Sequence, residues 1–146
     1  MTSPLRTLLD RVEQGEGADR TINWDIADAF GMVPAHRIVE TGFDYDWYRK
    51  AGDTALWKAN DSEGRSVSLW QPEDVTGSID AVVSLVEKVL PGWDHGYESG
   101  DCVAFGKVWS QGRHDDTVVR GEARTPARAI LAATLRAKIA QEERNA

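Results

Sequence analysis

The spacing of apolar residues predicts two short helices at the start of the chain. In the first, residues 4–14, one helical face carries four apolar side chains: Leu5, Leu8, Leu9 and Val12. Ser3 and Pro4 stand at its start, where N-cap and first-turn residues of these types are common. The second helix is predicted to begin after Asp19, a suitable N-cap, and to end near Gly31.

The next part of the chain, residues 32–53, follows neither a helical nor a strand repeat. It contains Pro34, Gly42 and Gly52, which favour turns, beside the acidic and aromatic run Phe43–Tyr48. We therefore predict a long irregular connection, of the kind that is often functional or mobile. After it, the β-rich runs TALWKAN and RSVSLW flank the turn sequence DSEG and predict a β-hairpin.

The second half begins with a predicted helix over residues 77–90, for which Ser78 is the expected N-cap. Its apolar residues form a wide stripe: Ile79, Val82, Val83, Val86, Val89 and Leu90. Three strand-like runs follow, WDHGYE, DCVAFGKVWS and TVVRGEA, and the short turns between them predict an antiparallel meander. The middle run is mostly apolar on both faces, so we expect a central strand with helices on both sides of it.

The final predicted helix is rich in alanine. Thr125 is its expected N-cap, and Pro126 its first residue. Four small residues allow it to approach a neighbour closely: Ala127, Ala132, Ala133 and Ala137. Ala104 and Gly106 give the central strand small residues on one face, so we expect tight contact between this helix and the sheet. The polar residues 141–146 are predicted to fray.

Together these patterns predict one α+β domain over residues 1–146. The expected order is two helices, two strands, a helix, three strands and a last helix. We expect an antiparallel sheet of about five strands, packed between helices.

Charge and composition argue against several functional classes of protein. The formal net charge is −7, which argues against nucleic-acid binding, because phosphate contacts need lysine and arginine. No apolar run reaches the roughly 18 residues of a membrane span, and the N-terminus lacks the pattern of a signal peptide. The one cysteine, Cys102, suits a reducing compartment. We expect a cytoplasmic protein that binds neither membranes nor nucleic acid.

No motif in the sequence predicts catalysis, a cofactor or a metal centre. His114, in the sequence His-Asp-Asp, falls in a turn between predicted strands, and a metal would need further ligands from other segments. Cys102 could pair with His95 or His114 as nucleophile and base, but its place at the start of an apolar strand favours a packing role. We therefore expect neither catalytic residues nor a bound cofactor, and a chain that is not an enzyme.

Two groups of residues are candidate binding sites. Arg124 and Arg128 flank the start of the final helix at Thr125, where free N–H groups and the helix dipole favour a nucleotide or another anion. The second group lies in the acidic and aromatic run: Tyr45, Trp47 and Tyr48. Because tyrosine and tryptophan often anchor protein interfaces, we expect this group to contact another protein.

Three segments resemble the small phage and prophage proteins that carry the phage ABA-sandwich domain: DRTINWDIADAFG, TGSIDAVVSLVEKVLPGW and TPARAILAATLRA. The resemblance covers residues 5–31 and 74–140. Asn23 and Val75 depart from its pattern, in which an acidic and an aromatic residue are more usual. It implies a sheet between two helical layers. It implies no activity and no functional residues.

These observations lead to one preferred function and two alternatives. We expect a non-enzymatic accessory protein of phage or prophage type, in the cytoplasm of a bacterial host cell, that binds a host or phage protein or associates with itself. The first alternative is a protein that binds or sequesters a nucleotide or another small anion. The second is an enzyme whose catalytic residues come from scattered positions.

Overall fold

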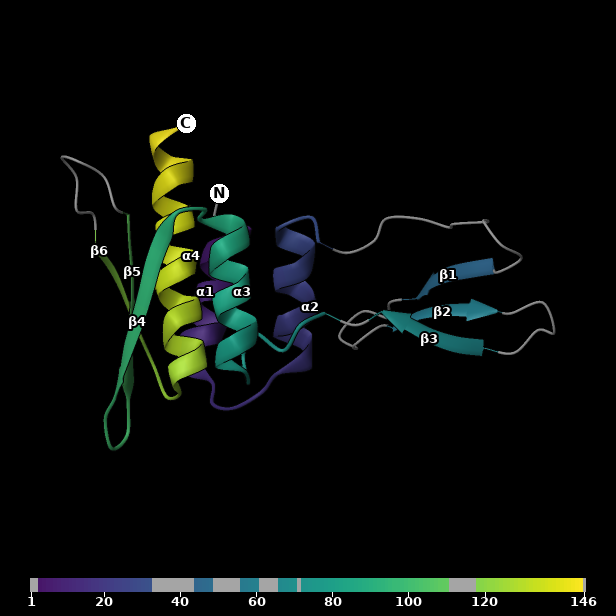
Figure 1. Ribbon diagram of the computed structural model, residues 1–146, viewed down its shortest axis with the longest axis horizontal. Coiled ribbons are helices and arrows are strands. Elements are labelled where there is room, and N and C mark those ends of the chain that lie inside the picture. Colours follow the sequence, from purple (N-terminus) through teal and green to yellow (C-terminus); the bar gives the residue numbers. More distant parts are fainter. Residues whose placement is uncertain are drawn as a thin grey trace.

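The computed structural model describes residues 3–32, 72–110 and 118–145, and the backbone of three strands between residues 33 and 71. Figure 1 shows the arrangement of its helices and strands. In chain order the elements are α1 (Pro4–Gln14), α2 (Arg20–Ala29), β1 (Asp44–Tyr48), β2 (Leu56–Asn60), β3 (Ser66–Trp70), α3 (Ile79–Val89), β4 (Trp93–Ser99), β5 (Ala104–Ser110), β6 (Val118–Ala123) and α4 (Pro126–Arg144).

The α+β class is confirmed, but the predicted sheet of about five strands is wrong. The strands form two antiparallel sheets of three, in the orders β1-β2-β3 and β4-β5-β6, and Figure 1 shows the two sheets apart from each other. The predicted hairpin is present as β2 and β3, which pair from Asn60↔Ser66 onward. The order of elements agrees with the prediction except for β1, which lies within the segment predicted to be irregular.

The second sheet has β5 as its central strand, as predicted, with β4 and β6 paired antiparallel on either side. The expectation of helices on both faces is wrong for the part of the chain that the structure describes. There, α1, α3 and α4 all lie on one side of this sheet (Figure 1). The other side carries Phe105, which is 48% exposed. The two faces of β5 are both rich in apolar residues, and that similarity misled the sequence interpretation.

Helix α4 lies flat on the covered face of the sheet because two glycines leave room for it. Gly106 and Gly121 are paired across β5 and β6. A Cβ atom at Gly106 would overlap the backbone of Ala129, and one at Gly121 would overlap the backbone of Ala133. The predicted close contact between small residues of the last helix and of the sheet is therefore confirmed.

The core explains the alanine content of α4. Residues 127–135 of this helix are all buried, because the sheet covers one side and α1 and α3 pack on the other. Its large side chains, Ile130, Leu131 and Leu135, are fully buried in the same core cluster as apolar residues of α1 and α3.

The helix starts were well predicted because caps are local. The side chains of Ser3, Asp19, Ser78 and Thr125 each accept a hydrogen bond from a backbone N–H in the first turn of the following helix. Helix α4 extends to Arg144, into the segment that was predicted to fray. Its last turns are held by α1, where Ser3 donates to Glu142 and Arg6 pairs with Glu143.

A buried polar network joins the start of α2 to the loop before α3. The hydroxyl of Thr76, which is fully buried, accepts from the Asp19 N–H at 2.7 Å and donates to Asn23 Oδ1 at 2.8 Å. Asn23 Nδ2 donates to Asp74 at 2.9 Å, and Asp74 also accepts from the Gly77 N–H at 3.0 Å. These bonds fix the start of α2 against the loop before α3.

Candidate functional site

The uncovered side of the second sheet is the candidate site, and we call it the open face. Its members follow from the strand register and from the alternation of buried and exposed residues along β5 and β6. They are Asp94, Gly96, Glu98, Phe105, Lys107, Trp109, Val118, Arg120 and Glu122.

The register arranges the open face in three rows across the strands. The first row consists of Glu98, Phe105 and Glu122. The second row consists of Gly96, Lys107 and Arg120. The third row consists of Asp94, Trp109 and Val118. Acids, bases and apolar side chains therefore occupy defined, neighbouring positions.

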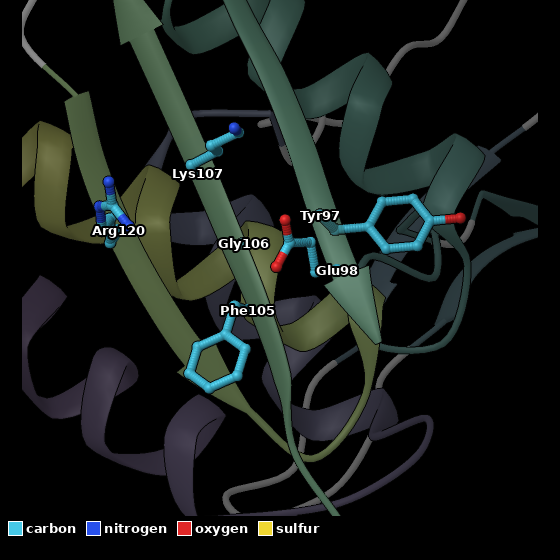
Figure 2. A pocket seen from close by; sticks show the side chains of 6 residues that line it. All are labelled: Tyr97, Glu98, Phe105, Gly106, Lys107 and Arg120. Carbon is cyan, nitrogen blue, oxygen red and sulfur yellow. The ribbon is translucent and has the colours of Figure 1, made fainter. Parts of the chain in front are cut away.

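Large apolar side chains are exposed on this face. Phe105 is 48% exposed and Val118 is 45% exposed, and both stand on strands whose alternate residues are buried against α4. Tyr97 is 46% exposed, but it is paired with Gly106 and belongs to the other side of the sheet. Figure 2 shows its ring pointing sideways, away from β5.

Trp109 is held in place by its neighbours. The Lys107 ammonium lies 5.3 Å from the centroid of its ring, close enough for a cation–π interaction. Gly96 leaves space for both side chains, because a Cβ there would lie 3.3 Å from Lys107 Cε and 3.6 Å from the Trp109 ring. Trp109 of the third row is thus packed against Lys107 and Gly96 of the second row.

Three charges of the open face have no partner among the described residues. Neither Glu98, Arg120 nor Glu122 forms an ion pair or a side-chain hydrogen bond within that part of the chain. With Asp94 and Lys107, the face carries three acids and two bases, a net charge of −1, while the chain as a whole carries −7. The open face is therefore nearly neutral in net charge, but its acidic and basic side chains occupy distinct positions.

A shallow hollow crosses the first two rows. Its volume is about 120 Å³, well below the roughly 300–1,000 Å³ of typical small-molecule sites. Figure 2 shows the side chains that border it. They are Tyr97, Glu98, Phe105, Lys107 and Arg120, with Gly106 in the floor. The hollow suits a side chain of a partner better than a whole cofactor.

Comparisons with protein-family models, with curated proteins and with solved structures find no match to this chain. Among the described residues, no three histidine, cysteine, aspartate or glutamate side chains are grouped as ligands for a metal ion. Within the same residues, no helix has the length and apolar character required to cross a membrane. The open face is therefore assessed on its geometry.

The structure does not assemble the predicted anion site at the start of α4. Arg128 is buried, and its guanidinium donates to the carbonyls of Gly17 at 2.8 Å, Val12 at 3.1 Å and Arg11 at 3.2 Å. Two of these carbonyls belong to the last turn of α1, so Arg128 caps the end of that helix. Burial away from water lowers the pKa of Arg128, and the nearby charge of Asp19 partly opposes this effect.

The other two residues of that predicted site also have structural partners. Arg124 forms an ion pair with Glu16 at 3.4 Å. The Thr125 hydroxyl accepts from the Arg128 N–H as the N-cap of α4. The guanidinium groups of Arg124 and Arg128 therefore both have protein partners, on α1 and on the loop after it.

The predicted protein-contact residues lie on β1, opposite β2. Tyr45 is paired with Ala59, Trp47 with Trp57 and Tyr48 with Leu56. Their side chains lie outside the described residues, so this prediction stays untested. Cys102 is exposed in the turn between β4 and β5, and His114 lies outside the described residues.

The open face was missed at the sequence level although a signal was present. Lys107 interrupts the apolar run of β5, and Arg120 and Glu122 alternate with Gly121 in β6. One charge within β5 and two charges at alternate positions of β6 indicate a face that meets water.

Proposed function

We propose that the chain is a non-enzymatic accessory protein that binds another polypeptide through the open face. The observation that supports this proposal most is the exposure of Phe105 and Val118 beside unpaired charges, on a face that the described helices leave uncovered. Aromatic residues and arginine are enriched in protein interfaces, so the composition of the face suits this role.

The charge pattern supports recognition of a specific partner. Buried without partners, Glu98, Arg120 and Glu122 would lose hydration without compensation, at a cost that opposes binding. A partner with opposite charges at matching positions avoids this cost, whereas other partners do not. The cation–π pair of Lys107 and Trp109 adds a large aromatic side chain beside these charges.

The sequence resemblance to phage and prophage proteins is our reason for proposing a bacterial host cell as the setting of this role. The anion-binding alternative has less support, because the Arg128 guanidinium is occupied by three carbonyls.

Site-directed photo-crosslinking in the organism that carries the gene tests the proposal. A benzoylphenylalanine at position 118, on the open face, should give a covalent adduct with a polypeptide, whether another protein or a second copy. The control carries the same group at position 87, on the exposed surface of α3, and should give little adduct. Adducts of equal yield at both positions, or none at position 118, would contradict the proposal.

A substitution then links the adduct to the face itself. Phe105→Ser removes the central aromatic side chain of the first row and should strongly reduce the yield from position 118. Glu87→Lys, in the same reporter background, should leave the yield unchanged.

A further inference from the structure

The proposed function does not identify the partner. The charges in the rows of the open face indicate which partner would fit. Resting on that function, we propose that the open face binds the open face of a second copy of the chain. The two copies form a two-fold dimer in which the sheets stack face to face with their strands antiparallel. Charge complementarity between the rows selects this arrangement.

A dimer whose two-fold axis runs parallel to the strands is unfavourable if β6 contacts the other copy. An axis over β5 would place Glu98 of one copy against Glu122 of the other. An axis between β5 and β6 would place Lys107 against Arg120. Both arrangements oppose like charges at close range, which destabilises an interface. An axis between β4 and β5 leaves the charges of β6 without any partner.

Two-fold axes across the strands differ according to the row at which they lie. An axis through any one row sets a charged residue against its own copy: Glu98 or Glu122 in the first row, Lys107 or Arg120 in the second, and Asp94 in the third. An axis between the second and third rows sets Asp94 against Gly96, beside Lys107, but it pairs Arg120 with Val118, so neither Arg120 nor Glu122 gains an opposite charge.

An axis between the first and second rows satisfies the charges. It places Glu122 of each copy against Arg120 of the other, so two ion pairs form by symmetry. Phe105 of each copy then meets Lys107 of the other, an aromatic ring facing an ammonium group. Glu98 faces Gly96, over which the end of the Lys107 side chain lies, so its carboxylate comes near the Lys107 ammonium.

The size of the face predicts a weak dimer. Three strands about 4.8 Å apart and five residues long, at about 3.3 Å per residue, cover roughly 14 by 16 Å. Interfaces of this class are transient, well below the area of stable dimers. We therefore expect association that depends on concentration in the range of about 0.01 to 1 mM.

Sedimentation equilibrium of the purified full chain at fixed salt tests the dimer. The wild type should show an average mass that rises from monomer towards dimer with concentration. Arg120→Glu and Glu122→Arg should each raise the dimer dissociation constant by about tenfold or more, because both symmetric pairs become repulsive. The double variant Arg120→Glu/Glu122→Arg restores opposite charges and should restore association.

Matched controls separate the pairing from net charge and from folding. Arg144→Glu and Glu87→Lys change the net charge by the same amounts, away from the open face, and should dimerise like the wild type. Circular dichroism and the midpoint of urea unfolding verify that each variant is folded. If a single variant unfolds, the swapped double variant and the Phe105→Ser variant still test the interface.

The outcomes also separate this dimer from the broader proposal. A wild type that stays monomeric up to 1 mM overturns the dimer, and so does a folded double variant that fails to recover association. A monomeric wild type that still gives an adduct with a different protein at position 118 leaves the proposed function standing. The absence of any adduct together with a monomeric chain overturns both.

Discussion

The two faces of the second sheet share one set of strands but are built on opposite principles. On the covered face, Gly106 and Gly121 have no side chains, and the backbone of α4 fills the space. On the open face, Phe105, Lys107 and Arg120 are large and extend from the strands without a covering element in the described part of the chain (Figure 2). Apolar content alone does not decide which face is buried; the fit of the opposing layer does.

Charged residues follow the same division. On the covered side, Arg128 donates to three carbonyls, and Arg136 on α4 pairs with Glu13 on α1 at 3.0 Å. On the open face, Arg120 and Glu122 have no such partner within the described residues. A charged side chain without an ion pair or hydrogen bond inside the fold is available to a binding partner. This difference favours the open face as the binding surface.

Adding a side chain to the covered face should have the largest effect. We expect Gly121→Val to lower the free energy of unfolding by about 3 kcal/mol or more, because its Cβ would overlap the backbone of α4, which cannot move aside. Urea unfolding followed by circular dichroism measures the change. The control is Gly96→Ala on the open face, where the nearest atom is the flexible end of Lys107, and the expected loss is under about 1 kcal/mol.

Replacing the buried arginine, Arg128, should have the next largest effect on stability. Arg128→Met leaves three carbonyls without their donor, and we expect a loss of about 2 to 3 kcal/mol in unfolding free energy. Arg120→Met on the open face removes a charge of the same kind and should barely change the urea midpoint. Equal losses in the two variants would contradict the division between satisfied and unsatisfied charges.

The part of this fold that was predictable from sequence is the part set by neighbours in the chain. Ser3, Asp19, Ser78 and Thr125 were identified as caps because a cap bonds to the turn that follows it. The alanines of α4 and the small residues of β5 indicated close contact, since a helix can approach a sheet only where side chains are short.

The features that the sequence did not predict depend on contacts between segments far apart in the chain. Arg128 meets carbonyls more than a hundred positions earlier in the chain, so sequence alone suggested an anion site at a helix start instead of a cap on α1. The uncovered side of β5 was likewise hidden, because Phe105 and Trp109 look like core residues when the covering layer is unknown.

A smaller effect is expected for the polar network behind the covered face. Thr76→Val keeps the shape of the side chain but removes the acceptor of the Asp19 N–H and a donor to Asn23, at a cost of about 1 to 3 kcal/mol. Thr134 is the matched control. It is equally buried, but its hydroxyl donates only to the Ile130 carbonyl within α4. Thr134→Val should therefore cost under about 1 kcal/mol in the same urea measurement.

The smallest effect on stability should come from Phe105, the most exposed large apolar side chain of the open face. Phe105 is about half exposed, whereas the adjacent core residue Val108 is fully buried. We expect Phe105→Ala to change the free energy of unfolding by less than about 1 kcal/mol, and Val108→Ala, which removes fewer atoms, to cost about 2 kcal/mol or more. Association should respond in the opposite order, with Phe105→Ala weakening the dimer and folded Val108→Ala retaining it. A Phe105→Ala variant that loses as much stability as Val108→Ala would place Phe105 in the core and remove the basis for treating this face as a binding surface.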